Sequence, residues 1–94
     1  MKDLIVNAKD ATHCVTLFNK ESDIPLKFRT WSTYTIAKSK DQARTRAKYQ
    51  YAFHYLCWKL RRTLKETVHD KDLILTQLAN FKRKRAVTTT IDEI

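Results

Sequence analysis

The sequence contains no glycine among its 94 residues. Phosphate-binding loops of the P-loop and dinucleotide-binding types need glycine where the backbone closes around the phosphate. Tight hairpin turns also favour glycine, because their central residues take positive φ angles. The absence excludes nucleotide sites built on glycine loops, and it favours a helix-rich fold whose few strands are joined by longer loops.

Cysteine and long apolar runs are also scarce. The two cysteines, Cys14 and Cys57, are far apart and form no CxxC pair, so the sequence indicates neither a disulfide scaffold nor an established zinc pattern. The apolar run in MKDLIVNAKD is much shorter than a signal-peptide core or a membrane span. We expect a cytoplasmic protein, in the host cytoplasm if viral, with no cofactor, no metal and no membrane association.

Acidic residues are outnumbered by basic ones. The chain has 19 Lys and Arg against 10 Asp and Glu, for a formal net charge of +9. Such a field attracts nucleic acid, anionic lipid headgroups or an acidic protein surface. The carboxylates are scattered, and no activated nucleophile with an oxyanion site can be recognised, so we expect no enzymatic activity. The length fits a single small domain over residues 1–94.

The secondary structure of the first third of the chain is ambiguous from the sequence. The short apolar run Leu4–Ala8 predicts a strand. Asp10 is a suitable N-cap for a helix in which Ala11, Cys14, Val15 and Phe18 have helical spacing. A strand through His13–Phe18 is the alternative, because Val, Thr and Phe favour extended structure.

Lys27–Ala37 follows the only proline and has the clearest strand composition, with aromatic and β-branched residues. Strand alternation predicts one face toward the core, with Phe28, Thr30, Ser32, Tyr34 and Ile36. It predicts a basic outer face with Lys27, Arg29, Trp31, Thr33 and Thr35.

Two helices are predicted in the second half of the chain. Ser39 and Gln42 form a capping-box signature, and no breaker follows until about Glu66. Asp70 can cap a further helix to about Lys82, whose apolar side has Ile74, Leu75, Leu78 and Phe81. Residues 86–94 are either a frayed tail or an edge strand. The sequence therefore predicts an α+β fold in which a small sheet packs on a long amphipathic helix, with a second C-terminal helix.

The long helix has two faces at 100° per residue. Its predicted core stripe consists of Tyr49, Phe53, Leu56, Leu60 and Leu64. The opposite face alternates cationic and aromatic side chains: Arg44, Lys48, Tyr51, Tyr55, Trp58 and Arg62. Cations neutralise phosphates, and aromatic rings stack on exposed bases. An alternative interpretation is that these rings pack beneath another element and leave only their polar atoms exposed.

The leading functional hypothesis is a small basic protein that binds nucleic acid, either DNA or RNA, through this helix face. The outer residues Arg29 and Trp31 and the basic run Lys82, Arg83, Lys84 and Arg85 would extend the interface. The basic run is alternatively a solvated helix end, where cations complement the helix dipole.

The extended aromatic segment that leads through AKSKDQAR into an Ala- and Arg-rich helix, over Trp31–Tyr55, resembles small accessory proteins encoded by temperate phages and prophages. The resemblance implies an early-expressed protein that acts on nucleic-acid metabolism. It also implies an alternative function, namely a modulator or inhibitor of a host nucleic-acid enzyme such as a recombination nuclease. It assigns no functional residue.

Overall fold

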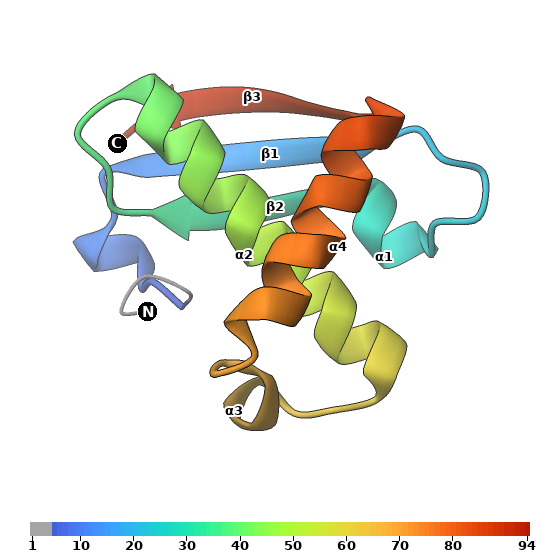
Figure 1. Ribbon diagram of the computed structural model, residues 1–94. Helices are drawn as coiled ribbons and strands as arrows, with labels where there is room; N and C mark the ends of the chain where they lie inside the picture. Colours follow the sequence, from blue (N-terminus) through green and yellow to red (C-terminus); the bar gives the residue numbers. More distant parts are fainter. Residues whose placement is uncertain (1–4) are drawn as a thin grey trace.

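The computed structural model describes residues 5–94. Three antiparallel strands form one sheet in the order β2-β1-β3, with bounds β1 (His13–Asn19), β2 (Thr30–Thr35) and β3 (Val87–Glu93). The helical elements are η1 (Ala8–Asp10), α1 (Leu26–Arg29), α2 (Lys40–Leu60), α3 (Leu64–Thr67) and α4 (Lys71–Lys84). The long helix α2 lies across one face of the sheet, and α4 packs against α2 (Figure 1). The predicted α+β fold class is confirmed.

β1 is the central strand, and it occupies the segment for which a helix was the preferred prediction. Alternate residues point under the helices: His13, Val15, Leu17 and Asn19 are buried. This period of two is that of a strand, so the helix prediction is wrong and the alternative strand is observed. The helical pattern misled because it counted only apolar residues, whereas His13 and Asn19 are buried polar ones.

The predicted N-terminal strand is also wrong. Leu4 lies outside the described residues, Ile5–Asn7 have no regular structure, and Ala8–Asp10 form the single 3-10 turn η1. Asp10 is therefore the last residue of a short turn and does not cap a helix.

β2 is a strand as predicted, but its two faces are exchanged. The strand starts only at Thr30, because Leu26–Arg29 form the helical turn α1. Phe28 is buried as part of that helical turn, so its burial does not indicate which side of β2 faces the core. The side that faces the helices carries Trp31, Thr33 and Thr35, while Thr30, Ser32, Tyr34 and Ile36 are exposed.

The start of α2 is the predicted one, but its end comes earlier. Ser39 Oγ accepts a hydrogen bond from the Gln42 backbone N–H at 3.1 Å, as the capping signature requires. The helix ends at Leu60 rather than Glu66, because Arg61 takes a left-handed conformation with φ of 54°. Thr63 then caps α3: its Oγ1 accepts a hydrogen bond from the Glu66 backbone N–H at 3.2 Å and donates one to Glu66 Oε1 at 2.9 Å.

α4 supplies the second half of the helical layer. Ile74, Leu78 and Phe81 are buried, but Leu75 is 42% exposed and does not belong to the apolar side. The Asp70 side chain does not cap α4. Its carboxylate instead accepts a hydrogen bond from Arg62 Nη1 at 2.9 Å.

The core lies between the sheet and α2. Of the predicted core stripe, Phe53 and Leu56 are buried and Tyr49 and Leu64 are half-buried, but Leu60 is exposed. Residues 86–94 supply the edge strand β3, which pairs with β1 from Val87 to Glu93, so the frayed alternative is not observed. Within residues 5–94, no helix combines the length and the apolar character that a bilayer crossing needs.

Candidate nucleic-acid interface

Tyr51, in the middle of the predicted binding face, is a core residue. It is 1% exposed. Its hydroxyl donates a hydrogen bond to the Phe28 carbonyl oxygen at 2.7 Å and accepts one from Asn19 Nδ2 at 3.1 Å. The Phe81 ring from α4 lies 5.2 Å away between centroids. The prediction that Tyr51 stacks on a ligand is therefore wrong, because α4 covers this part of α2.

Tyr55 is half-buried one turn further along α2. Its ring lies 5.1 Å from that of Phe81 and 5.5 Å from that of Phe28, both in edge-on geometry. Burial raises the pKa of Tyr55, as it does that of Tyr51. Tyr55 therefore serves mainly to join α1, α2 and α4.

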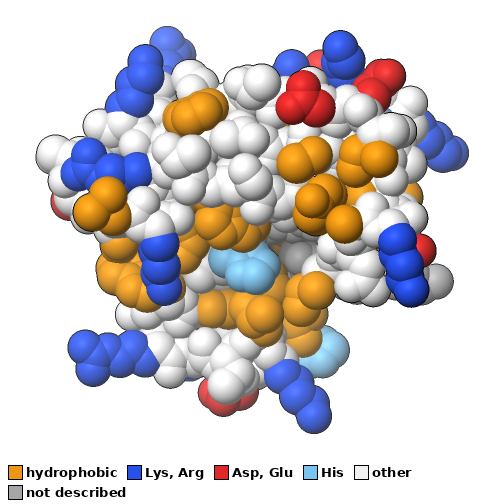
Figure 2. All heavy atoms as spheres, turned by 180° about the vertical axis from the view of Figure 1, so that it is seen from behind, with side chains coloured by type: hydrophobic (Ala, Val, Ile, Leu, Met, Phe, Trp, Pro, Cys, Tyr) orange, Lys and Arg blue, Asp and Glu red, His pale blue; other side chains and the backbone are white. Residues whose placement is uncertain are grey.

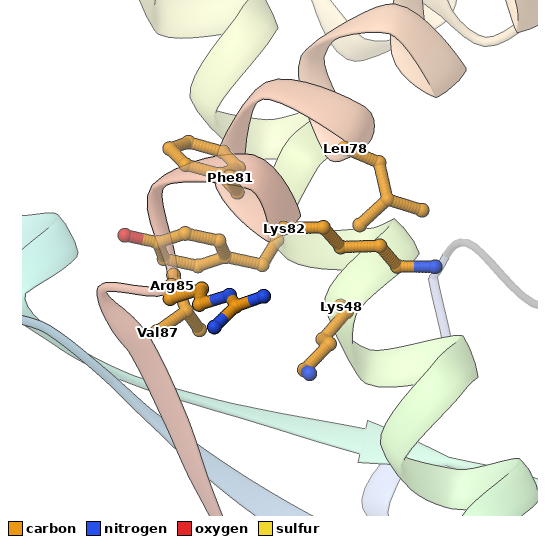
Figure 3. A pocket seen from close by; sticks show the side chains of 7 residues that line it. Lys48, Leu78, Phe81, Lys82, Arg85 and Val87 are labelled. Atoms are coloured by element: carbon orange, nitrogen blue, oxygen red, sulfur yellow. The ribbon is translucent and has the colours of Figure 1, made fainter.

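A cleft of about 240 Å³ lies between α2, α4 and β3 and is here called the basic cleft. Its cations are Lys48 from α2 and Lys82 and Arg85 from the end of α4. Figure 3 shows the charged ends of Lys48 and Arg85 directed into the same space, whereas the Lys82 side chain leads along the cleft with its nitrogen away from that of Arg85. Within the described part of the chain, none of these three side chains has an ion pair with a carboxylate. The cleft is lined by Lys48, Tyr51, Leu78, Phe81, Lys82, Arg85 and Val87.

The positive charges in and beside the basic cleft repel one another. Burial lowers the pKa of Lys48, and the nearby charges of Lys82 and Arg44 lower it further. Arg44 itself is fixed beside the cleft, since it pairs with Asp41 at 2.6 Å and donates from Nε to Thr89 Oγ1 at 3.3 Å. A bound anion would relieve this repulsion and favour the charged form of Lys48.

Arg85 reaches the cleft through an uncommon backbone conformation. It ends α4 with φ of 52°, in the left-handed region that glycine usually occupies at a helix C-terminus. This left-handed conformation costs a residue with a Cβ atom roughly 1–2 kcal/mol. Arg61 ends α2 in the same way, so both long helices end in a left-handed arginine.

A second concavity, here called the tryptophan groove, lies between α1, β2 and the C-terminal half of α2. It has a volume of about 500 Å³ and is lined by Lys27, Phe28, Trp31, His54, Cys57, Trp58, Arg61 and Arg62. Seen from behind, hydrophobic side chains surround a hollow that contains a histidine, with Lys and Arg side chains around it (Figure 2). Trp58 is 42% exposed, so its predicted place on an accessible surface is retained.

The remaining predicted residues hold other parts of the fold together. Arg29 donates to the carbonyl oxygens of Ile24 and Ser22, and it lies on α1 rather than on a strand. Lys84 pairs with Glu21 at 3.2 Å, and Arg83 donates to Asn80 Oδ1. Trp31 points toward α2, with its ring 5.0 Å from that of His54, and not to an outer face. The predicted set is therefore divided between the basic cleft, the tryptophan groove and structural contacts.

Sequence reasoning missed Lys27, His54 and Arg61 as members of the groove. Lys27 was assigned to the outer face of a strand, although it lies on α1. The Thr63–Glu66 capping box was a readable signal that a new helix starts there, and it would have placed Arg61 in the break between two helices. Burial lowers the pKa of His54, which favours the neutral form of its ring.

No family model, curated protein or solved structure matches the chain. The resemblance to phage accessory proteins therefore stays a prediction. Among residues 5–94, no group of three or more His, Cys, Asp and Glu side chains is arranged to hold a metal ion.

Proposed function

We propose that this is a small, non-enzymatic, cytoplasmic nucleic-acid-binding protein that holds phosphate groups in the basic cleft. The observation that supports this proposal is that Lys48, Lys82 and Arg85 line one cleft, with no carboxylate partner among the described residues. Lys48 comes from α2, whereas the other two come from the end of α4, so tertiary packing brings them together. Like charges held at close range destabilise a fold unless an anion neutralises them.

The chemistry of the cleft suits phosphate oxygens. Arg85 offers a planar fork of N–H donors that can bind two oxygens of one phosphate, and the lysines add compact charges. Leu78, Phe81 and Val87 line the cleft beside these cations and lower the local polarity around them, although Lys82 and Arg85 are themselves exposed. Arg44, fixed beside the cleft by Thr89, can extend the same contacts to a neighbouring phosphate.

Equilibrium binding of a labelled oligonucleotide to cleft variants tests the proposal. We expect Lys82→Ala and Arg85→Ala each to weaken binding about tenfold, the loss typical of one charge-assisted contact. Lys65→Ala is the matched control, because it removes the same charge from α3, beyond the other end of α4. It should change the affinity less than about twofold, since exposed distant charges are screened by salt.

Two outcomes would contradict the proposal. One is equal weakening by the cleft variants and by Lys65→Ala, which would indicate only a general effect of net charge. The other is undetectable binding to single-stranded and duplex DNA and RNA. If a partner protein were then recovered equally with and without nuclease treatment of a lysate, the alternative function as a modulator of a host nucleic-acid enzyme would be favoured.

A further inference from the structure

The tryptophan groove shares no lining residue with the basic cleft. Its volume of about 500 Å³ lies within the roughly 300–1,000 Å³ typical of pockets that bind small molecules. None of the described residues that line it is acidic, and Lys27, Arg61 and Arg62 provide positive charge. Among residues 5–94, only Arg62 of these three has a carboxylate partner, Asp70 at 2.9 Å. The groove therefore combines aromatic rings with cations that remain available for an anionic ligand.

The indole rings of Trp31 and Trp58 are both packed against other aromatic rings. Trp58 contacts the rings of Phe28 at 5.9 Å and Tyr55 at 5.6 Å, and Trp31 contacts Tyr51 at 5.6 Å. An exposed ring that is already fixed by its neighbours loses little conformational entropy when a ligand stacks on it. The packing thus preorganises Trp58 as a platform, although it leaves 42% of the residue exposed.

The cations lie where they can contact a charged backbone beside a stacked base. Lys27 Nζ lies 5.8 Å from the centre of the Trp58 ring and 5.2 Å from that of Phe28. Arg61 lines the groove in its left-handed conformation, which glycine or asparagine adopts more easily. Strained residues of this kind persist most often where a side chain serves a binding site.

We propose that the tryptophan groove binds an unstacked nucleobase, with Lys27 and Arg61 contacting the adjoining phosphates. The preferred ligand is then single-stranded DNA or RNA, because bases in a duplex are stacked on each other and cannot reach an aromatic ring. This inference rests on the proposed nucleic-acid-binding function and specifies which form of nucleic acid is bound.

The test compares a fluorescently labelled single strand with a duplex of the same length at the same salt concentration. Trp58→Ala should weaken binding of the single strand about 5- to 150-fold, the effect of losing one base stack, and should change duplex binding less than twofold. Leu75→Ala is the matched control, because Leu75 is exposed to the same extent but lies on α4 outside the groove. It should leave both affinities unchanged.

A second variant, Arg61→Gly, keeps the helix end in its preferred conformation while removing the cation, so it tests the groove without depending on how well Trp58→Ala folds. It should weaken single-strand binding about tenfold. If Trp58→Ala and Arg61→Gly bind the single strand as the wild type does, while Lys82→Ala still weakens binding, the base-binding groove is wrong and the proposed function stands. If the wild type binds neither single strand nor duplex, both proposals fail.

Discussion

Tyr51, Tyr55 and Trp58 follow one another along one side of α2, yet their environments differ completely. Tyr51 is buried with both hydrogen-bonding capacities of its hydroxyl used, Tyr55 is half-buried, and Trp58 is 42% exposed. The difference arises from Phe81, whose ring covers the two tyrosines but makes no ring contact with Trp58. At the scale of single residues, aromatic side chains on one helix face therefore divide into a core part and a surface part.

Removing the Tyr51 hydroxyl tests its role in the core. Tyr51→Phe leaves the Phe28 carbonyl without its donor and the Asn19 amide without its acceptor in a buried site, so the free energy of unfolding should fall by about 1–3 kcal/mol. Urea denaturation measures this change. Tyr34→Phe is the control, because the Tyr34 side chain is exposed, and its effect should stay within about 0.5 kcal/mol. Unchanged stability with weaker nucleic-acid binding would instead place Tyr51 in the interface.

At the scale of elements, the two long helices end in the same way. Each ends at a left-handed residue, a position that glycine usually occupies, in a chain without glycine. α2 ends at Arg61 and α4 at Arg85, both left-handed, and each arginine lines one of the two basic concavities. Glycine at either position would relieve the backbone, but it would also remove a cation from a proposed binding surface. Stability and binding are therefore opposed at these two residues.

Arg85→Gly should separate these two effects. The free energy of unfolding should stay the same or rise by up to about 1 kcal/mol, because glycine adopts the left-handed conformation without strain. Affinity for nucleic acid should fall about tenfold with the lost cation. Thermal unfolding and equilibrium binding measure the two quantities on the same sample.

Arg83→Gly is the matched control for this prediction. It lies within the last turn of α4, where glycine is less favourable by up to about 1 kcal/mol, and its side chain does not line the basic cleft. It should lower stability and leave affinity nearly unchanged. Equal destabilisation by both variants would refute the account of Arg85.

The elements differ in how far the sequence could predict them. The start of α2 was predictable from its capping residue, and α4 from its apolar periodicity, because both are local signals. The faces of β2 were not, because Phe28 belongs to a helical turn and shifted the apparent phase of the strand. β1 was mistaken for a helix because its buried positions include His13 and Asn19, whose burial depends on tertiary partners.

The candidate site was also predictable only in part. The sequence indicated Lys48 and the run from Lys82 to Arg85 separately, and only the packing of α4 on α2 shows that Lys48, Lys82 and Arg85 share a cleft. Lys27 and Arg61 were missed because they lie at element ends, where a small error in the boundary moves a side chain to another face. The same packing buries Tyr51, which the helix wheel placed with the surface residues.

At the scale of the whole molecule, a net charge of +9 is carried on a body of about 31 × 28 × 21 Å. Much of this charge is spread over the surface, as lysines and arginines at the rim of Figure 2 illustrate. Such a field draws in any polyanion at low salt, so affinity alone does not identify a binding site. In the proposed function the basic cleft neutralises a defined number of phosphates, and each phosphate neutralised there would release counterions.

The salt dependence of binding tests this claim most directly. The measurement is the slope of log K against log salt concentration for the wild type and for the triple variant Lys48→Ala/Lys82→Ala/Arg85→Ala. We predict a steep wild-type slope and a triple-variant slope shallower by about 2 to 3, because three phosphate contacts are lost. Equal slopes for the two proteins, or a wild-type affinity that does not depend on salt, would contradict the assignment of the basic cleft as the phosphate-binding site.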